Sequence, residues 1–212
     1  MINPTISEWL NFIARWIHVF AGIMWVGTTY YFTWLDARLT EEEKALLNTD
    51  KAAQIWMVHS GGFYVVEKRK VPDELSRKLH WFKWEAGTTW LSGFALLIIA
   101  TAFGLTHVLS GRAVYIRIGA MFGTIMAANV WMRILPAQRK MIEAINAGKL
   151  PDAKLAAQAK LRSKQNTFMA VPVVFLMISS HFGGTTTGGY DWIHLAILIP
   201  VGWLAAKFIR RA

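Results

Sequence analysis

The chain has 212 residues, of which 54% are hydrophobic, and its several long apolar runs favour a polytopic helical membrane protein over a soluble domain. Its net charge of +10 comes from Lys and Arg gathered in two connections and at the C-terminus. That distribution is typical of cytoplasmic loops, so we expect a lipid bilayer as partner and no nucleic acid. With 0 Cys, disulfides, thiolate metal sites, iron–sulfur clusters and covalent c-type heme are excluded within this chain.

The first long apolar run, residues 9–35, predicts a transmembrane helix that carries Arg15 and His18. The residues before it lack a basic segment, and the run is too long for a signal peptide, so we expect this helix to remain. Arg15, His18 and Gly22 share one helix face. A heme would explain the pattern, with an imidazole on the iron, an arginine on a propionate and a glycine leaving room for the ring. A histidine in an ordinary interhelical hydrogen bond would explain it equally well.

The connection 36–78 is polar and basic, except for the aromatic segment 54–66, which is too short to span a bilayer. We predict an interfacial or re-entrant segment with His59 available to point inward. Its aromatic side chains would lie at headgroup level: Trp56, Phe63 and Tyr64.

The second predicted helix, residues 79–106, begins with His80 and carries a polar stripe on its inner half. The stripe follows helical spacing and consists of Glu85, Thr88, Thr89 and Ser92. Such a stripe should line a cavity or a helix contact rather than face lipid. Glu85 is then either a proton carrier in a substrate cavity or the partner of a neighbouring side chain such as Lys83.

Three further helices are predicted at residues 114–135, 166–182 and 191–208, with an amphipathic connection at 136–165. The connections 36–78 and 133–164 each carry eight Lys and Arg, and the tail carries three. By the positive-inside rule the N-terminus lies outside and the C-terminus inside. The expected fold is therefore all-α, a single membrane domain of five transmembrane helices with additional interfacial helices. Asn129 and Asn166 could hydrogen-bond across helices in this bundle.

The predicted topology sorts the histidines by depth. His18 and His181 both fall in the outer half of the membrane, where they could face each other across one heme. His59 and His80 lie near the cytoplasmic face, where they could form a second heme site, a substrate site or interfacial anchors. The sequence therefore indicates one heme b, or two.

Several segments in order along the chain resemble the membrane domain of the bacterial membrane-bound urate oxidase (urate hydroxylase) family. They include RWIHVFAGIMWVGTTYYFTWLD, WMVHSGGFY, LHWFKWEAGTTWLSGFALL and AKLRSKQNTFMAVPVVFLMISSHF. The resemblance implies oxidation of urate at a site in the bacterial inner membrane, with electrons passing to cytochrome c. Typical members have more helices between the second and third predicted here, and a C-terminal cytochrome c domain with a CxxCH motif that this sequence lacks.

The leading hypothesis is a b-type heme membrane oxidoreductase that oxidises urate or a related small molecule and reduces a separate cytochrome c. His18 and His181 would ligate the heme iron, with Arg15 and Gly22 completing the cofactor site. The inner, catalytic site would contain Glu85, His80 and His59. Two alternatives stay open: a non-catalytic heme b anchor for a partner dehydrogenase, and a heme-free channel or transporter for small solutes. Homo-oligomerisation is compatible with each of them.

Overall fold

The computed structural model describes residues 4–46, 52–69, 78–102, 111–179 and 191–209, and most of them are helical. The predominance of helix is as predicted. The helices are α1 (Pro4–Ala45), α2 (Trp84–Ala102), α3 (Gly111–Ala128), the π-helical turn η1 (Asn129–Ile134), α4 (Leu135–Asn146), α5 (Ala153–Ser179) and α7 (Asp191–Ile209).

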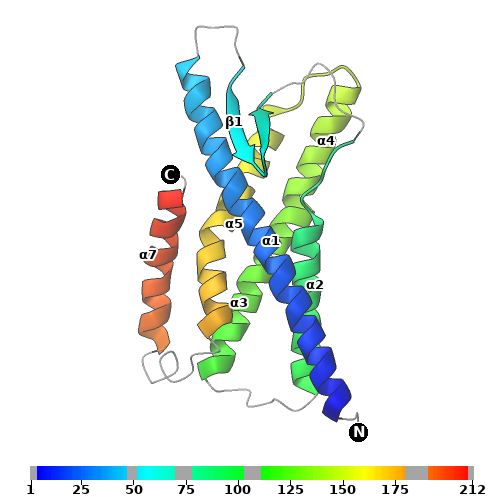
Figure 1. The fold of residues 1–212 in the computed structure, drawn as a ribbon, viewed down its shortest axis with the longest axis vertical. Coiled ribbons are helices and arrows are strands. Elements are labelled where there is room, and N and C mark those ends of the chain that lie inside the picture. Colours follow the sequence, from blue (N-terminus) through cyan, green and yellow to red (C-terminus); the bar gives the residue numbers. More distant parts are fainter. Residues whose placement is uncertain (1–3, 47–51, 70–77, 103–110, 180–190, 210–212) are drawn as a thin grey trace.

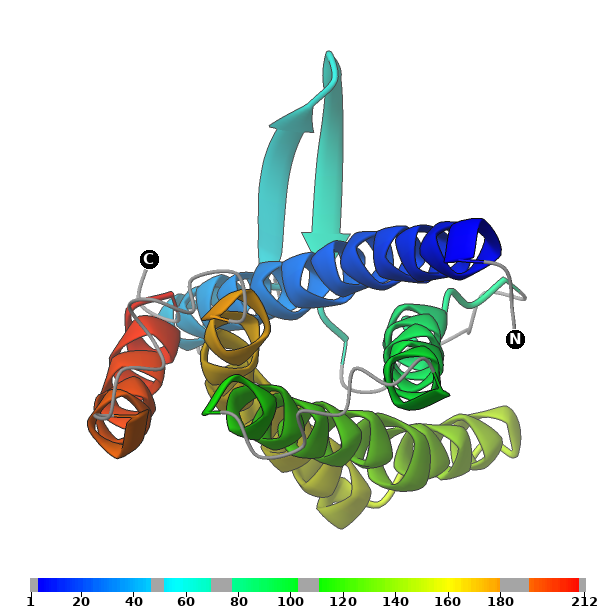
Figure 2. The ribbon, with the colours of Figure 1, turned by 90° about the horizontal axis from the view of Figure 1, so that it is seen from below.

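The helices form a bundle in which α5 lies between α1 and α3 (Figures 1 and 2). α2 pairs with α1, and α7 lies at the opposite edge against α5. The segments α3, η1 and α4 follow one another without a break and form one long rod. A buried cluster joins α1, α2, α5 and the rod formed by α3, η1 and α4 at the centre of the bundle: Trp25, Ala86, Met126, Ala127, Val130, Leu135 and Ala170.

The aromatic segment after α1 forms an antiparallel β-hairpin, which corrects the prediction of an all-α fold. Its strands are β1 (Gln54–His59) and β2 (Gly62–Glu67). The two turn residues Ser60 and Gly61 have φ values of 49° and 76°. Positive φ at both positions of a two-residue loop matches the twist of paired strands, so this turn specifies a hairpin and not a re-entrant helix.

Among the described residues, Tyr31 Oη of α1 donates a hydrogen bond of 3.2 Å to Met57 Sδ in β1, and the hairpin packs against the bundle near its base. There Ile55 and Val66 pack against a small buried cluster of Leu35, Leu39 and Ala53. Beyond the base the strands project away from the helices (Figure 2). The other hairpin face is apolar and exposed, with side chains of Trp56, Val58, Phe63 and Val65.

Asp36 connects three elements at the same end of the molecule. Its Oδ1 lies 2.5 Å from Lys68 Nζ at the hairpin base, and its Oδ2 lies 2.8 Å from Lys160 Nζ on α5. Burial of Asp36 favours its neutral form, but the hydrogen bonds and charges of Lys160 and Lys68 outweigh that effect and lower the pKa of the carboxyl below its ordinary value.

Several helix boundaries differ from those expected. α1 begins at Pro4 and α2 at Trp84, where the sequence predicted residues 9 and 79. α1 also continues ten residues past Leu35 to Ala45, because no glycine or proline interrupts it there. The expected connection 136–165 instead contains α4 and the beginning of α5. Two helical stretches in the described part are long and apolar enough to cross a membrane, Glu8–Ala45 and Tyr115–Asn146.

Candidate functional site

The contact between α1 and α2 places His18 against the polar stripe of α2. His18 Nδ1 lies 2.9 Å from the carbonyl oxygen of Thr89 and 3.2 Å from Ser92 Oγ. The hydroxyl of Ser92 also lies 2.6 Å from the carbonyl oxygen of Thr88. The stripe is therefore a helix contact, one of the two roles that the sequence predicted for it.

These contacts fix which imidazole nitrogen of His18 carries a proton. A carbonyl oxygen can only accept a hydrogen bond, so Nδ1 must donate to Thr89. In the neutral ring Nε2 then carries the lone pair, and no other described residue hydrogen-bonds to it. A histidine held through Nδ1 by a backbone carbonyl, with Nε2 unprotonated, has the arrangement usual for a metal ligand.

One glycine, Gly93, lets α1 and α2 approach closely at this point. A Cβ at Gly93 would lie 2.9 Å from His18 Cε1, so any side chain there would displace the imidazole. A Cβ at Gly22 would lie 3.9 Å from Thr89 Cγ2, an ordinary contact. Gly22 therefore faces α2 in this structure, where the sequence suggested that it leaves room for a heme ring.

The other predicted members of the heme site are not brought to His18 within the described part of the chain. Arg15 is exposed, and its Nε donates a hydrogen bond of 2.5 Å to Asn11 Oδ1 on the same helix. His181 lies outside the described residues.

Glu85 lies in the first turn of α2, at the N-terminal end of the polar stripe. Its Oε2 is buried and has no hydrogen-bond partner among the described residues. Lys83, the partner suggested by the sequence, instead lies over the Trp84 ring, 5.5 Å from its centroid. Because an unpaired buried polar oxygen is costly, Glu85 is a position where a ligand that donates a hydrogen bond would be stabilising.

The structure does not gather His80 and His59 around Glu85. His80 is exposed just before α2, and its ring contacts Phe82 edge to face at 4.5 Å between centroids. His59 is exposed beside the hairpin turn, paired with Gly62, on the part of the hairpin that projects from the bundle. Each histidine is thus accessible, but the two stand on separate elements.

A second polar contact joins the rod α3–η1 to α5. Asn166 Nδ2 donates a hydrogen bond of 3.0 Å to the carbonyl oxygen of Met126, and Asn166 Oδ1 accepts one of 2.9 Å from Asn129 Nδ2. The predicted interhelical pairing of these two asparagines is confirmed. The π-helical turn begins at Asn129, and a side chain that bonds to the helix carbonyls is a known cause of such irregular turns.

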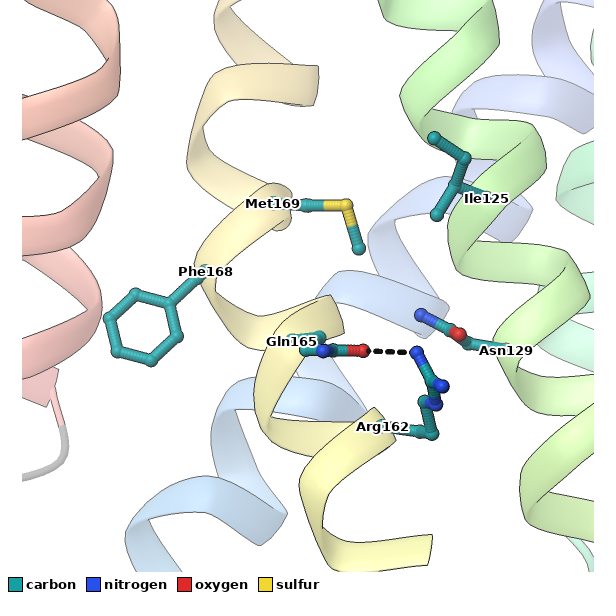
Figure 3. A pocket seen from close by; sticks show the side chains of 6 residues that line it. All are labelled: Ile125, Asn129, Arg162, Gln165, Phe168 and Met169. Atoms are coloured by element: carbon teal, nitrogen blue, oxygen red, sulfur yellow. Dashed lines mark hydrogen bonds between the residues drawn. The ribbon is translucent and has the colours of Figure 1, made fainter. Parts of the chain in front are cut away.

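Beside the asparagine pair, a cavity of about 470 Å³ opens between these helices (Figure 3). Arg162 Nη1 donates a hydrogen bond of 2.9 Å to Gln165 Oε1 at its edge. The lining residues are Ile125, Asn129, Arg162, Gln165, Phe168 and Met169. In Figure 3 five of these side chains converge on the space between the helices, whereas Phe168 points away from it.

Sequence reasoning missed Arg162 and Gln165, because Arg162 was counted among the cytoplasmic loop charges. Arg162, Gln165 and Asn166 stand at positions i, i+3 and i+4, a spacing that places three side chains on one face of a helix. This spacing is informative only if the segment is helical, and the structure shows that α5 begins at Ala153.

The fold and its polar contacts define a helical bundle that holds His, Asn and Arg side chains between helices, two of which are apolar enough to cross a membrane. The chain belongs to the urate oxidase N-terminal family: the family model matches residues 4–102 and 96–212. The resemblance to urate oxidases is thereby confirmed. None of the curated proteins and none of the solved structures compared with the chain matches it.

Proposed function

We propose that this protein is a membrane-embedded, urate oxidase-like oxidoreductase that uses heme b and transfers electrons to a separate cytochrome c. The observation that carries the proposal is the family match, whose two stretches together extend from residue 4 to residue 212. The functional residues would lie in the two polar contacts described above, because elsewhere the described helices contact one another mainly through apolar side chains.

The exposure of α1 supports a location in the bacterial inner membrane. Only 11% of its most apolar window is buried, whereas the core helix of a soluble protein would be mostly buried. Its outward side chains include Trp9, Phe12, Trp16, Phe20 and Ile23, each exposed by 60% or more. An apolar surface of this extent requires lipid or protein around it.

The hydrogen bond of His18 supports its proposed role as a heme ligand. The Thr89 carbonyl accepts from Nδ1, so Nε2 would be the donor atom for iron. His181 is the proposed second ligand, and Arg15 the proposed propionate partner. When bound, the heme would supply an acceptor for single electrons.

Glu85 is the proposed proton acceptor. Oxidation of urate releases protons together with electrons, and the unpaired Oε2 of Glu85 offers a base with no competing partner in the described structure. His80 and His59 are proposed to serve the same inner side of the molecule, where exposed imidazoles can exchange protons with water.

The test uses the full chain purified in detergent, supplied with urate and ferricytochrome c. Urate should disappear and cytochrome c should be reduced in proportion, and Glu85→Gln should lower the rate at least tenfold. If heme-containing protein reduces cytochrome c with a partner dehydrogenase but never consumes urate, the non-catalytic anchor replaces this proposal. If the protein contains no heme and consumes no urate, the channel or transporter alternative replaces it.

A further inference from the structure

The cavity between α3–η1 and α5 presents a positive charge that the described residues leave uncompensated. None of the ion pairs found among them involves Arg162, although Lys160, two residues earlier on the same helix, has a carboxylate partner. Arg162 Nε is buried and has no hydrogen-bond partner among the described residues. A buried, unpaired guanidinium N–H is costly, so an anion in this cavity would be stabilising.

Gln165 orients the guanidinium and adds a donor. Its Oε1 accepts the hydrogen bond from Arg162 Nη1, which leaves its amide NH₂ group available to a ligand. A neutral partner leaves the positive charge of the arginine unbalanced, whereas a carboxylate partner would make the pair neutral overall.

Asn129 adds an acceptor whose identity follows from the hydrogen-bond network. The carbonyl of Met126 can only accept, so Asn166 must direct its NH₂ group there and its Oδ1 toward Asn129. Asn129 therefore donates through Nδ2, and its Oδ1 remains available at the cavity. The cavity thus offers two donor groups, one of them charged, and one acceptor.

The remaining walls are apolar. Ile125 projects from α3 and Met169 from α5, and in Figure 3 they face each other across the space above the polar groups. The volume of about 470 Å³ lies within the range of small-molecule sites. Apolar sides with polar groups along one edge suit a flat ring that carries its hydrogen-bonding atoms on its rim.

We propose that this cavity binds the substrate: a planar, singly charged heterocyclic anion such as urate, with amide N–H and C=O groups on its rim. The inference deepens the proposed function and rests on it. Arg162 and Gln165 donate to the anionic rim, and Asn129 Oδ1 accepts from a ring N–H. A fatty acid satisfies Arg162 but offers no donor to Asn129 Oδ1, and inorganic phosphate has no ring to contact the apolar walls formed by Ile125 and Met169.

Calorimetric titration of the purified full chain with urate, without any electron acceptor, tests the proposal. Wild type should bind urate, and Arg162→Gln should weaken binding at least tenfold. Lys164→Gln, an exposed position two residues further along the same helix, removes the same charge and should leave binding unchanged. Gln165→Glu keeps the side-chain size, pairs the guanidinium internally and should also weaken binding at least tenfold.

The outcomes separate this inference from the proposed function. Urate oxidation by wild type, combined with unchanged urate binding in a folded Gln165→Glu protein, would refute the cavity and leave the function standing. Phosphate binding as tight as urate binding, lost equally in Arg162→Gln, would show a simple anion site and refute the heterocycle. Failure of wild type both to bind and to oxidise urate would refute both proposals.

Discussion

Two polar helix contacts in the described part of the chain, that of His18 and that of Asn166, differ in their residue types and in whether they close. Between α1 and α2 the polar groups are a histidine and short hydroxyls, and Gly93 lets the helices meet so closely that His18 Nδ1 reaches a backbone carbonyl. Between α3–η1 and α5 the asparagine pair forms a buried contact, but the longer Arg162 and Gln165 hold a cavity open beside it.

This difference distinguishes polar groups that hold helices together from polar groups that remain available to a ligand. In the α1–α2 contact, His18 Nδ1 is hydrogen-bonded, and only Nε2 of the imidazole has no hydrogen-bond partner among the described residues. In the α3–α5 contact, Asn166 is satisfied, whereas the outer groups of Asn129, Arg162 and Gln165 retain donors and an acceptor. We therefore propose the closed contact as the site of cofactor ligation and the open one as the substrate site.

The largest effect on stability is expected from Asn166→Leu. It removes both hydrogen bonds of a buried amide and leaves Asn129 Nδ2 unpaired, which should lower the free energy of unfolding by about 3 kcal/mol. Thermal unfolding in detergent measures it. Gln138→Leu, an exposed position on α4, is the control and should change little; equal stability of the two variants would mean that the asparagine pair does not hold α3 to α5.

Gly93→Ala should produce the next largest effect, at the closed contact. The new Cβ would overlap His18 Cε1, and overpacking of this kind costs about 1–3 kcal/mol. Gly27→Ala is the matched control on α1, because a Cβ there meets nothing within 4 Å. Imidazole NMR would report the loss of the Nδ1 hydrogen bond in Gly93→Ala alone, and an unchanged His18 signal would contradict the close contact.

Glu85→Gln should separate stability from activity. The neutral amide removes the cost of a buried unpaired carboxylate oxygen, so unfolding should require about 1 kcal/mol more than in wild type. Urate consumption should fall in the same protein. A variant that is both less stable and fully active would show that Glu85 has an unseen structural partner and no catalytic role.

The smallest effect concerns Asp36, outside both contacts. Because its folded pKa is lowered, its contribution to stability is complete above the ordinary carboxyl pKa and is lost as the pH falls through the folded value, below about 4. Asp36→Asn should abolish this acid-dependent component, which is well under 1 kcal/mol because the carboxyl is 38% exposed. Unfolding curves between pH 3 and 6, roughly the carboxyl titration range, would show it.

Sequence reasoning anticipated the helices, the role of the α2 stripe as a helix contact and the asparagine pair. These depend on local periodicity and on polar residues inside apolar runs, which the sequence displays directly. It missed the hairpin because the exposed face carries Trp56, Val58, Phe63 and Val65. With apolar residues on both faces, the alternation that identifies a strand is absent.

The cavity could not be predicted for a different reason. It depends on where α5 begins and on the π-helical turn at Asn129, and both are set by contacts between segments distant in sequence. The single proton on His18 Nδ1 is likewise a consequence of which carbonyl α2 presents to it.

The most direct test of the account is the reduced-minus-oxidised visible spectrum of the detergent-purified protein, compared between wild type and His18→Ala and normalised to protein. The account predicts the absorption of a b-type heme in wild type and its loss in a folded His18→Ala protein. Absence of heme from wild type expressed with ample heme, or an identical spectrum in the two proteins, would contradict the assignment of the closed helix contact to a cofactor.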